Sequence, residues 1–404
     1  IAELITLVSM TAAVMNITLD VGRPERFIVN VVPHGQWRAP FVWSMTVIST
    51  YVVGSTVYLY LAMRRDLCIC AAEIPRRRWL YGLLSIAYSD SEGSRRTHGR
   101  VVWWCAVIIL PIMVSVHSVY GYVFGLQAGR PGWYNPFLAP YFVLGAIVTG
   151  FSAIIVVVAI LRRVFRWQEY FPPRMFKGLG IFLGFVTLLY LYFFFSEQLT
   201  GQYSAPAAER AVSNDLLWGR FAWLTWSSVI GGLVIPFWAL FIQGARPGFS
   251  SIPLTVACAI LINVALWIKR FLIVVPSFYH PHLPYRVAEY TPTPLEWTVM
   301  GGTWIFAIFF FSILVKLLPV IEIPPGFPLK KNYAFQPGLV VSRAEKAVVV
   351  LLTVLAGIGM IAYGFATRDL DYAPVKWLTG ILLLCAVPLE ICLIRTQALR
   401  RYAY

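Results

Sequence analysis

The chain has 404 residues, of which 59% are hydrophobic and only 13% are charged. In an ordinary soluble domain about a quarter of the residues are charged, so this balance excludes a soluble globular protein. The 33 Lys and Arg residues outnumber the 18 Asp and Glu residues, which gives a formal net charge of +15. A nucleic-acid binder would display these cations on solvated faces. An apolar chain has few such faces, so the excess points to orientation in a membrane.

Ten apolar stretches reach the roughly 20 residues that a helix needs to cross a bilayer. They take up more than half of the chain, and no connection between them is long enough to form a separate domain. We therefore expect an all-α, polytopic transmembrane bundle. The expected spans are residues 1–19, 39–63, 101–127, 136–161, 177–199, 216–242, 251–276, 296–319, 345–366 and 375–395.

The cations between these spans are divided unequally. Of the 33 Lys and Arg residues, 21 fall in the connections on the side of segment 64–100 and nine in the alternate connections. Excess cations hold short loops in the cytoplasm, so segment 64–100 should be cytoplasmic in a multi-pass protein of the bacterial inner membrane. Aromatic residues near the span ends fit an interfacial belt: Trp133, Tyr134, Trp218, Trp297 and Trp377.

Ionisable side chains inside a span are informative because each costs about 2.5–3.5 kcal/mol to insert. His117 lies within span 101–127, and Tyr120, Gly121 and Phe124 share its helical face. A neutral imidazole and a phenol on one face could bond a quinone carbonyl and relay its proton. The alternative is a core histidine bonded to a neighbouring hydroxyl.

Span 251–276 carries a second polar stripe, Asn263, Trp267 and Arg270, with Lys269 about 100° away. Lys269 is expected to snorkel towards the surface. Arg270 fits either a pocket wall or an ion pair with an acid such as Asp20. Glu197, at the end of span 177–199, is expected to be interfacial.

Two further acids are candidates for a proton path. Glu3 lies deep in the inner half of the first expected span. Glu390 lies near the cytoplasmic end of the last one, where an interfacial position is the alternative.

The sequence offers few residues for metal or nucleotide binding. A transmembrane b-type haem needs two facing imidazoles, and His117 is the one histidine inside an expected span. The six cysteines lack C-x-x-C spacing and read as small buried residues. Phosphate-binding and metalloprotease signatures are missing. The remaining chemistry is binding a membrane-soluble ligand, passing protons or ions, or docking a partner that carries the redox centres.

Several strings resemble the NrfD/PsrC family of quinone-binding membrane subunits, and within it the integral subunits of alternative complex III. The resemblance keeps its order from residue 1 to about 322 and implies that one more helix would precede residue 1. The strings are LDVGRPERF at 19–27, RAP at 38–40, SVHS at 115–118, PYFVLGA at 140–146, NVALWIKRF at 263–271 and YTPTPLEW at 290–297.

The resemblance implies two packed four-helix bundles plus extra helices, with no haem or iron–sulfur cluster bound by this chain. It also implies that menaquinol or ubiquinol binds near the periplasmic face and passes electrons to a peripheral iron–sulfur subunit. Proton translocation, a molybdopterin-bearing partner, other membrane subunits including a paralogue, and lipids belong to the same expectation. Residues 323–404 would add two helices outside the resemblance.

At matching positions, the resemblance suggests roles for individual residues. Asp20 would accept a quinol proton, and His117 and Tyr120 would bond the headgroup. Arg23 and Arg270 would keep Asp20 ionised and orient the ring. The other expected quinone-binding residues are Ser44 and Trp267.

Departures from the resemblance leave other functions open. Where the quinol subunit of alternative complex III is expected to have histidine, this chain has Asp20, and Ser44 and Val123 stand where acids are expected. The chain could be a non-catalytic structural or proton-conducting paralogue in the same complex, or the membrane anchor of a molybdopterin oxidoreductase. A secondary transporter would need a broken helix, for which the Ser- and Gly-rich segment 227–236 is the candidate.

Overall fold

The computed structural model describes residues 1–20, 31–74, 77–86, 88, 91–203, 205–282 and 290–319, together with a few positions between 351 and 358. The expected span 375–395 and nearly all of the expected span 345–366 therefore lie outside the described residues. The chain forms two compact units. Residues 1–34, 52–108 and 292–404 belong to unit 1, and residues 35–51 and 109–291 belong to unit 2.

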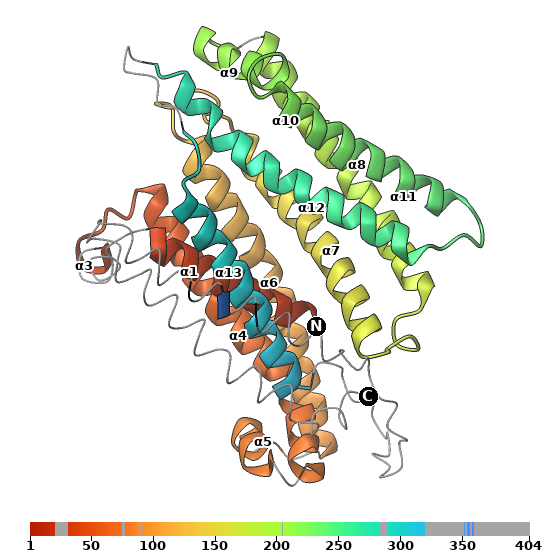
Figure 1. Ribbon diagram of the computed structural model, residues 1–404. Helices are drawn as coiled ribbons and strands as arrows, with labels where there is room; N and C mark the ends of the chain where they lie inside the picture. Colours follow the sequence, from red (N-terminus) through yellow and green to blue (C-terminus); the bar gives the residue numbers. More distant parts are fainter. Residues whose placement is uncertain are drawn as a thin grey trace. The chain divides into compact units, whose positions relative to one another are not determined.

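All regular secondary structure within the described ranges is helical, which confirms the all-α prediction (Figure 1). Eight of these helices are long and apolar enough to cross a membrane, and they match the first eight expected spans. The elements are α1 (Ala2–Asp20), α3 (Val32–His34), α4 (Pro40–Glu73), α5 (Arg78–Ser85), α6 (Glu92–Gly125), α7 (Leu138–Val164), α8 (Pro173–Tyr203), α9 (Ala207–Leu217), α10 (Ala222–Trp226), the π-helix η3 (Ser227–Val234), α11 (Ile235–Ala245), α12 (Ile252–Val274), the 3₁₀ helix η4 (Pro276–Tyr279) and α13 (Pro294–Leu317).

Several helices run beyond the spans expected from hydropathy. Helix α6 begins at Glu92 instead of about residue 101, and α4 continues to Glu73 instead of about residue 63. Hydropathy marks the apolar length of a helix, whereas the backbone hydrogen bonds continue through the polar residues at its ends. For the same reason the connection expected between spans 177–199 and 216–242 contains the end of α8 and most of α9.

Unit 2 contains a four-helix bundle of α7, α8, α11 and α12, one of the two bundles expected. Helix α12 packs along α7 and α11, and α8 packs along α7 and α11; Figure 1 shows the four helices running side by side. Leu183, Leu240 and Ile262 are fully buried between them. Helix α9 lies at the end of this bundle where α8 ends, hereafter the α9 end.

The second half of α6 also belongs to unit 2 and packs against the start of α7. A Cβ atom at Gly121 would collide with the backbone of Ala139, and one at Gly125 would lie 2.7 Å from the carbonyl oxygen of Asn135. Glycine is required at these positions because the two backbones approach too closely for any side chain. This contact turns the face of α6 that carries His117 towards α7.

The helix from Ala222 to Ala245 contains a π-helical turn and is unbroken. Residues Ser227–Val234 form η3 between α10 and α11, and Gly232 admits the side chain of Ala265 from α12. The wider π turn keeps each residue helical, so the segment lacks the unwound backbone that a transporter site of the expected kind would use.

Unit 1 contains α1, α13 and parts of α4 and α6. Helix α1 packs along α13, and the Thr303 hydroxyl donates to the Asn16 side-chain oxygen at 3.0 Å. Helix α13 begins with a capping box: the Thr293 amide donates to Glu296, and the Glu296 amide donates to the Thr293 hydroxyl. The YTPTPLEW string is therefore a helix-start signal in this structure.

The close approach of α6 and α7 predicts how glycine substitutions affect stability. Gly121→Ala should lower the thermal unfolding midpoint in detergent by several degrees, because overpacking against backbone costs about 1–3 kcal/mol. Gly150→Ala on α7 is the matched control, since a Cβ atom there has no neighbour within 4 Å, and it should leave the midpoint unchanged or slightly raised. Equal effects of the two variants would contradict the proposed packing.

Candidate functional site

The Arg270 guanidinium lies in a gap on the surface of α7. Its central carbon is 4.0 Å from the centroid of the Phe142 ring. A Cβ atom at Gly145 would lie 3.1 Å from one guanidinium nitrogen and 3.3 Å from the ring of Tyr190 on α8. Arg270 therefore occupies the space that the missing side chain of Gly145 leaves. Gly145 lies about 10 Å along α7 from its first residue, so the site is inside the membrane span.

Arg270 has no hydrogen-bond or ion-pair partner among the residues that the structure describes. Its contact with the Phe142 ring contributes about 0.5–2 kcal/mol. A cation in a bilayer also needs hydrogen-bond acceptors, and the guanidinium has five N–H donors. The side chain is thus available to bind an acceptor oxygen. Asp20, the expected ion-pair partner, ends α1, and its side chain lies outside the described residues.

His117 on α6 presents an unprotonated ring nitrogen near this cation. Its Nδ1 donates to the Met113 carbonyl oxygen at 2.9 Å. A carbonyl can only accept, so the neutral ring carries its proton on Nδ1, and the Nε2 lone pair has no partner among the residues that the structure describes. Arg270 interacts electrostatically with this imidazole. The partner is thus a backbone carbonyl of the same helix instead of the neighbouring hydroxyl expected for a core histidine, and a structural role for His117 remains the alternative.

A cluster of aromatic rings, Phe124, Trp133 and Phe142, lies between this site and the α9 end. The Phe124 ring is 5.9 Å from the Phe142 ring and 4.9 Å from the Trp133 ring. Trp133 donates from its indole nitrogen to the Ile273 carbonyl oxygen at 2.8 Å, so this expected interfacial anchor packs inwards. Tyr120 is half-buried on α6, one turn from His117. This ring cluster separates Arg270 from the α9 end with apolar side chains.

Lys269 is paired and buried, so the expectation that it snorkels is wrong. Its ammonium is 2.7 Å from a Glu197 carboxylate oxygen, and the two side chains are only 9% and 16% exposed. The ammonium also lies 5.6 Å from the Tyr141 ring centroid and 5.3 Å from that of Phe194. Glu197, which was expected to be interfacial, is largely covered by the same contact. The ion pair explains why Lys269 stays buried, because a paired charge need not reach water.

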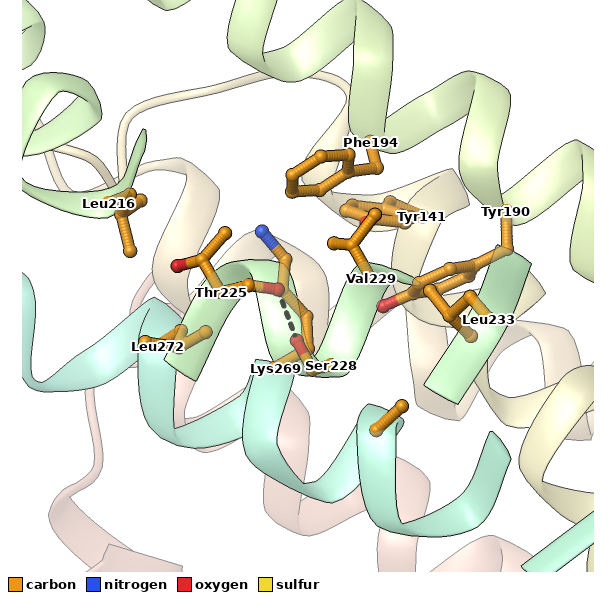
Figure 2. A pocket seen from close by; sticks show the side chains of 11 residues that line it. Tyr141, Tyr190, Phe194, Leu216, Thr225, Ser228, Val229, Leu233, Lys269 and Leu272 are labelled. Carbon is orange, nitrogen blue, oxygen red and sulfur yellow. Dashed lines mark hydrogen bonds between the residues drawn. The ribbon is translucent and has the colours of Figure 1, made fainter. Parts of the chain in front are cut away.

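A small cavity of about 10 Å³ adjoins Lys269, as Figure 2 shows. Thr225 and Ser228 line it at the start of the π turn. The Ser228 hydroxyl donates to the Thr225 carbonyl oxygen at 2.9 Å. The buried Thr225 hydroxyl has no hydrogen-bond partner in the described part of the chain. The cavity has room for about one water molecule beside this hydroxyl and the ammonium.

The other expected site residues are placed differently or lie outside the described residues. Ser44 is buried on α4 and donates to the Phe41 carbonyl oxygen of its own helix at 2.7 Å. Trp267 is 46% exposed on α12. Neither is brought into contact with His117 or Arg270 by the described interactions. Arg23 and Glu390 lie outside the described residues.

Glu3 lies in unit 1, beside a separate cavity of about 450 Å³. The cavity is lined by ionisable side chains from three helices: Glu3 from α1, Asp66 from α4, and Arg95 and His98 from α6. Asp66 is only 4% exposed. Within the described residues, no group of three His, Cys, Asp or Glu side chains could hold a metal ion.

The sequence singled out His117 and Arg270 as candidates but not the residues that contact them. Phe142 and Gly145 lie in the PYFVLGA string, to which no role was assigned, and Glu197 was expected to be interfacial. One signal was available: Leu138, Ala139, Phe142 and Gly145 repeat with helical spacing, so small and aromatic residues share one face of α7.

Comparisons with known proteins identify a family for most of the chain. Residues 1–281 match the family described as polysulphide reductase, NrfD. A putative membrane subunit of dimethyl sulfoxide reductase from Halobacterium salinarum is 33% identical over 235 residues, which cover 57% of this chain and 50% of that protein. The chain thus spans about half the length of this relative.

Two other relatives match over longer stretches at lower identity. A selenate reductase subunit of Mesobacillus selenatarsenatis is 24% identical over 330 residues, 77% of this chain and 75% of that protein. The Hdr-like menaquinol oxidoreductase integral membrane subunit of Archaeoglobus fulgidus is 24% identical over 328 residues, 77% of this chain and 72% of that protein.

The buried pair of Lys269 and Glu197 predicts non-additive mutations. Lys269→Met should destabilise the protein by about 3–5 kcal/mol, because it leaves a buried carboxylate unpaired. Adding Glu197→Gln should recover most of that loss. Thermal unfolding of both single variants and the double variant, in the same detergent, measures the coupling. Additive losses would show that the two side chains do not act as a pair.

Proposed function

The chain belongs to the polysulphide reductase NrfD family, and we propose that it binds a quinol headgroup between His117 and Arg270 and delivers the electrons to a docked redox subunit. One observation carries the proposal: within a membrane span, a cation without a carboxylate partner among the described residues lies near a histidine with a free Nε2 lone pair. Membrane subunits of this kind serve oxidoreductase complexes with other subunits.

The residues fit the two kinds of hydrogen bond that a quinol and a quinone need. A quinol supplies two electrons and two protons when it is oxidised. The His117 Nε2 accepts a hydrogen bond from a quinol hydroxyl, since Nδ1 already donates to Met113. The Arg270 guanidinium donates to a ring oxygen in either redox state. Tyr120, one turn along α6, offers a further hydroxyl to the same ring.

Proton transfer follows from the same arrangement. When His117 takes a proton at Nε2 it becomes a cation close to the fixed charge of Arg270. Repulsion between like charges then favours passing the proton onward. We assign the next acceptor to Asp20, with Arg23 beside it, on the sequence resemblance alone.

The names of the relatives support quinol oxidation as the direction of electron flow. One relative is named as a menaquinol oxidoreductase subunit, and two are named as subunits of reductases for dimethyl sulfoxide and selenate. A reductase of a terminal acceptor consumes electrons, which a quinol can supply. Menaquinol is therefore the preferred substrate class, and the docked partner carries iron–sulfur clusters or a molybdopterin.

The distribution of basic residues orients the chain in the cytoplasmic membrane, with the α9 end at the outer face. Arg270 then lies in the outer half of the membrane, and the redox subunit docks over the α9 end. The sequence alone assigns Glu3 to the inner half of the first span, and its cavity contains further ionisable side chains, which supports a role for Glu3, with Glu390, in a proton path.

Removing the charge of Arg270 should weaken quinol binding. Arg270→Gln should raise the KM for a menaquinol analogue by about 10- to 100-fold in the assembled complex, because a charge-assisted hydrogen bond contributes about 1.5–3 kcal/mol. Arg270→Lys should recover part of the affinity. The matched control is Arg130→Gln, since Arg130 makes a similar contact with the Phe278 ring at 5.2 Å but itself lies in the connection between two spans.

Titration of the purified complex with a fluorescent quinone analogue separates affinity from turnover. An unchanged dissociation constant in Arg270→Gln, with the complex intact, would assign this chain to a non-catalytic anchoring role. A loss in Arg130→Gln equal to that in Arg270→Gln would show that net charge alone, not the site, governs binding.

Filling the gap at Gly145 should act on the site more than on the fold. A methyl group there contacts the guanidinium of Arg270 and the Tyr190 ring, so Gly145→Ala displaces the cation by a few tenths of an ångström. We expect several-fold weaker quinone binding with a nearly unchanged unfolding midpoint. Gly150→Ala on the same helix is the control for both measurements, and wild-type affinity in Gly145→Ala would argue against a ligand at Arg270.

A further inference from the structure

Helix α5 in unit 1 has two apolar faces, and only one of them is buried. Tyr81 packs with Leu67, Cys70 and Ile74 of the α4 region, and Leu84 lies against the same cluster. The opposite face carries Trp79 and Leu83, which lie four residues apart and are 73% and 66% exposed. Ile86 follows the last helical residue in a non-helical conformation and is 60% exposed. These three side chains are hereafter called the exposed stripe.

The hydrogen bonds of α5 fix it where two membrane spans end. The Tyr81 hydroxyl donates to the Leu317 carbonyl oxygen at 2.9 Å, and Arg77 donates to the Lys316 carbonyl oxygen at 3.3 Å. Both acceptors belong to the last turn of α13, whose carbonyls have no partner within the helix. Helix α5 therefore lies across the end of span Pro294–Leu317 and just after the end of span Pro40–Ala72.

The C-terminal end of α5 is also fixed by hydrogen bonds. Arg64 of α4 donates from Nε to the Ser85 carbonyl oxygen at 3.1 Å and from a terminal nitrogen to that of Ile86. The following Tyr88 ring packs edge-on against His98 of α6. Because hydrogen bonds join both ends of α5 to spans, the position of the exposed stripe relative to α4 and α13 is fixed.

The charge around α5 indicates what covers the stripe. Segment 64–100 contains eight arginines and four acids, and Arg78, the first residue of α5, is exposed beside Trp79. A short helix with an aromatic and aliphatic stripe next to arginines is typical of a helix that lies in the membrane interface. Arginines at that level attract anionic headgroups.

We propose that α5 lies in the plane of the membrane interface and binds an anionic phospholipid. Trp79, Leu83 and Ile86 contact the acyl chains, and Arg78 contacts the headgroup phosphate. The lipid continues the hydrocarbon surface that already surrounds the spans α4 and α13. This site shares no residue with the proposed quinol site, whose headgroup ligands His117, Tyr120 and Arg270 belong to unit 2.

Photolabelling tests the proposal on the intact chain. The protein is reconstituted into nanodiscs of phosphatidylcholine or phosphatidylglycerol that contain a trace of the same lipid with a diazirine in its acyl chain. Trypsin then releases residues 79–95 as one peptide. We expect label on Trp79, Leu83 or Ile86 and not on Tyr81 or Leu84, with more label from phosphatidylglycerol.

Two matched arginine variants test the headgroup contact. Arg78→Gln should reduce the preference for phosphatidylglycerol about fivefold, since each arginine near an anionic surface contributes about that factor. Arg96→Gln should leave it unchanged, because Arg96 is exposed and already paired with Glu92 at 2.8 Å. Thermal unfolding of each variant confirms that the fold is intact.

Two results would overturn the proposal. Labelling of α5 by a water-soluble carbene reagent, without labelling from the acyl chain, would place the stripe in water. Protection from both reagents would mean that protein covers it, either residues beyond 319 of this chain or another subunit. Neither result would affect the quinone-binding measurements on Arg270.

Discussion

A positive charge inside a membrane span must find compensation within the protein, and α12 carries two such charges in adjacent positions. Lys269 is compensated by Glu197 on α8, at 2.7 Å. Arg270 turns towards α7, where it meets the Phe142 ring and no carboxylate among the described residues. The first cation pairs within the bundle, whereas we propose that the second binds a ligand. The candidate site depends on this difference between neighbouring residues.

Glycine and aromatic residues allow Arg270 to have surroundings that differ from those of Lys269. Gly145 leaves the gap for the guanidinium, and Gly121 lets α6 approach α7 closely enough to bring His117 to the same face. The ring cluster of Phe124, Trp133 and Phe142 then separates the cation from the α9 end. Such apolar surroundings would strengthen the hydrogen bonds that we propose Arg270 and His117 make to a ligand. The geometry of the candidate site therefore depends on the close backbone packing at Gly121 and on the gap at Gly145.

Much of this architecture could be predicted from the sequence, because long apolar stretches leave few alternatives to spanning helices. His117 and Arg270 could also be found, since ionisable residues within a span are rare. Their partners could not. Lys269 and Glu197 are 72 positions apart in the chain and lie on different helices. Hydropathy alone carries no information about which helices meet. Helix ends such as Glu92 were misplaced because polar residues continue a helix beyond the bilayer.

The central claim is that His117 and Arg270 hold the two sides of one quinol headgroup. A cryo-EM structure of the assembled complex with a tightly bound menaquinol analogue tests this most directly. The account predicts a ring oxygen within hydrogen-bond distance of His117 Nε2 and another oxygen, or the same one, within reach of the Arg270 guanidinium. A headgroup bound elsewhere, with a lipid tail packed between Phe142 and His117, would contradict it.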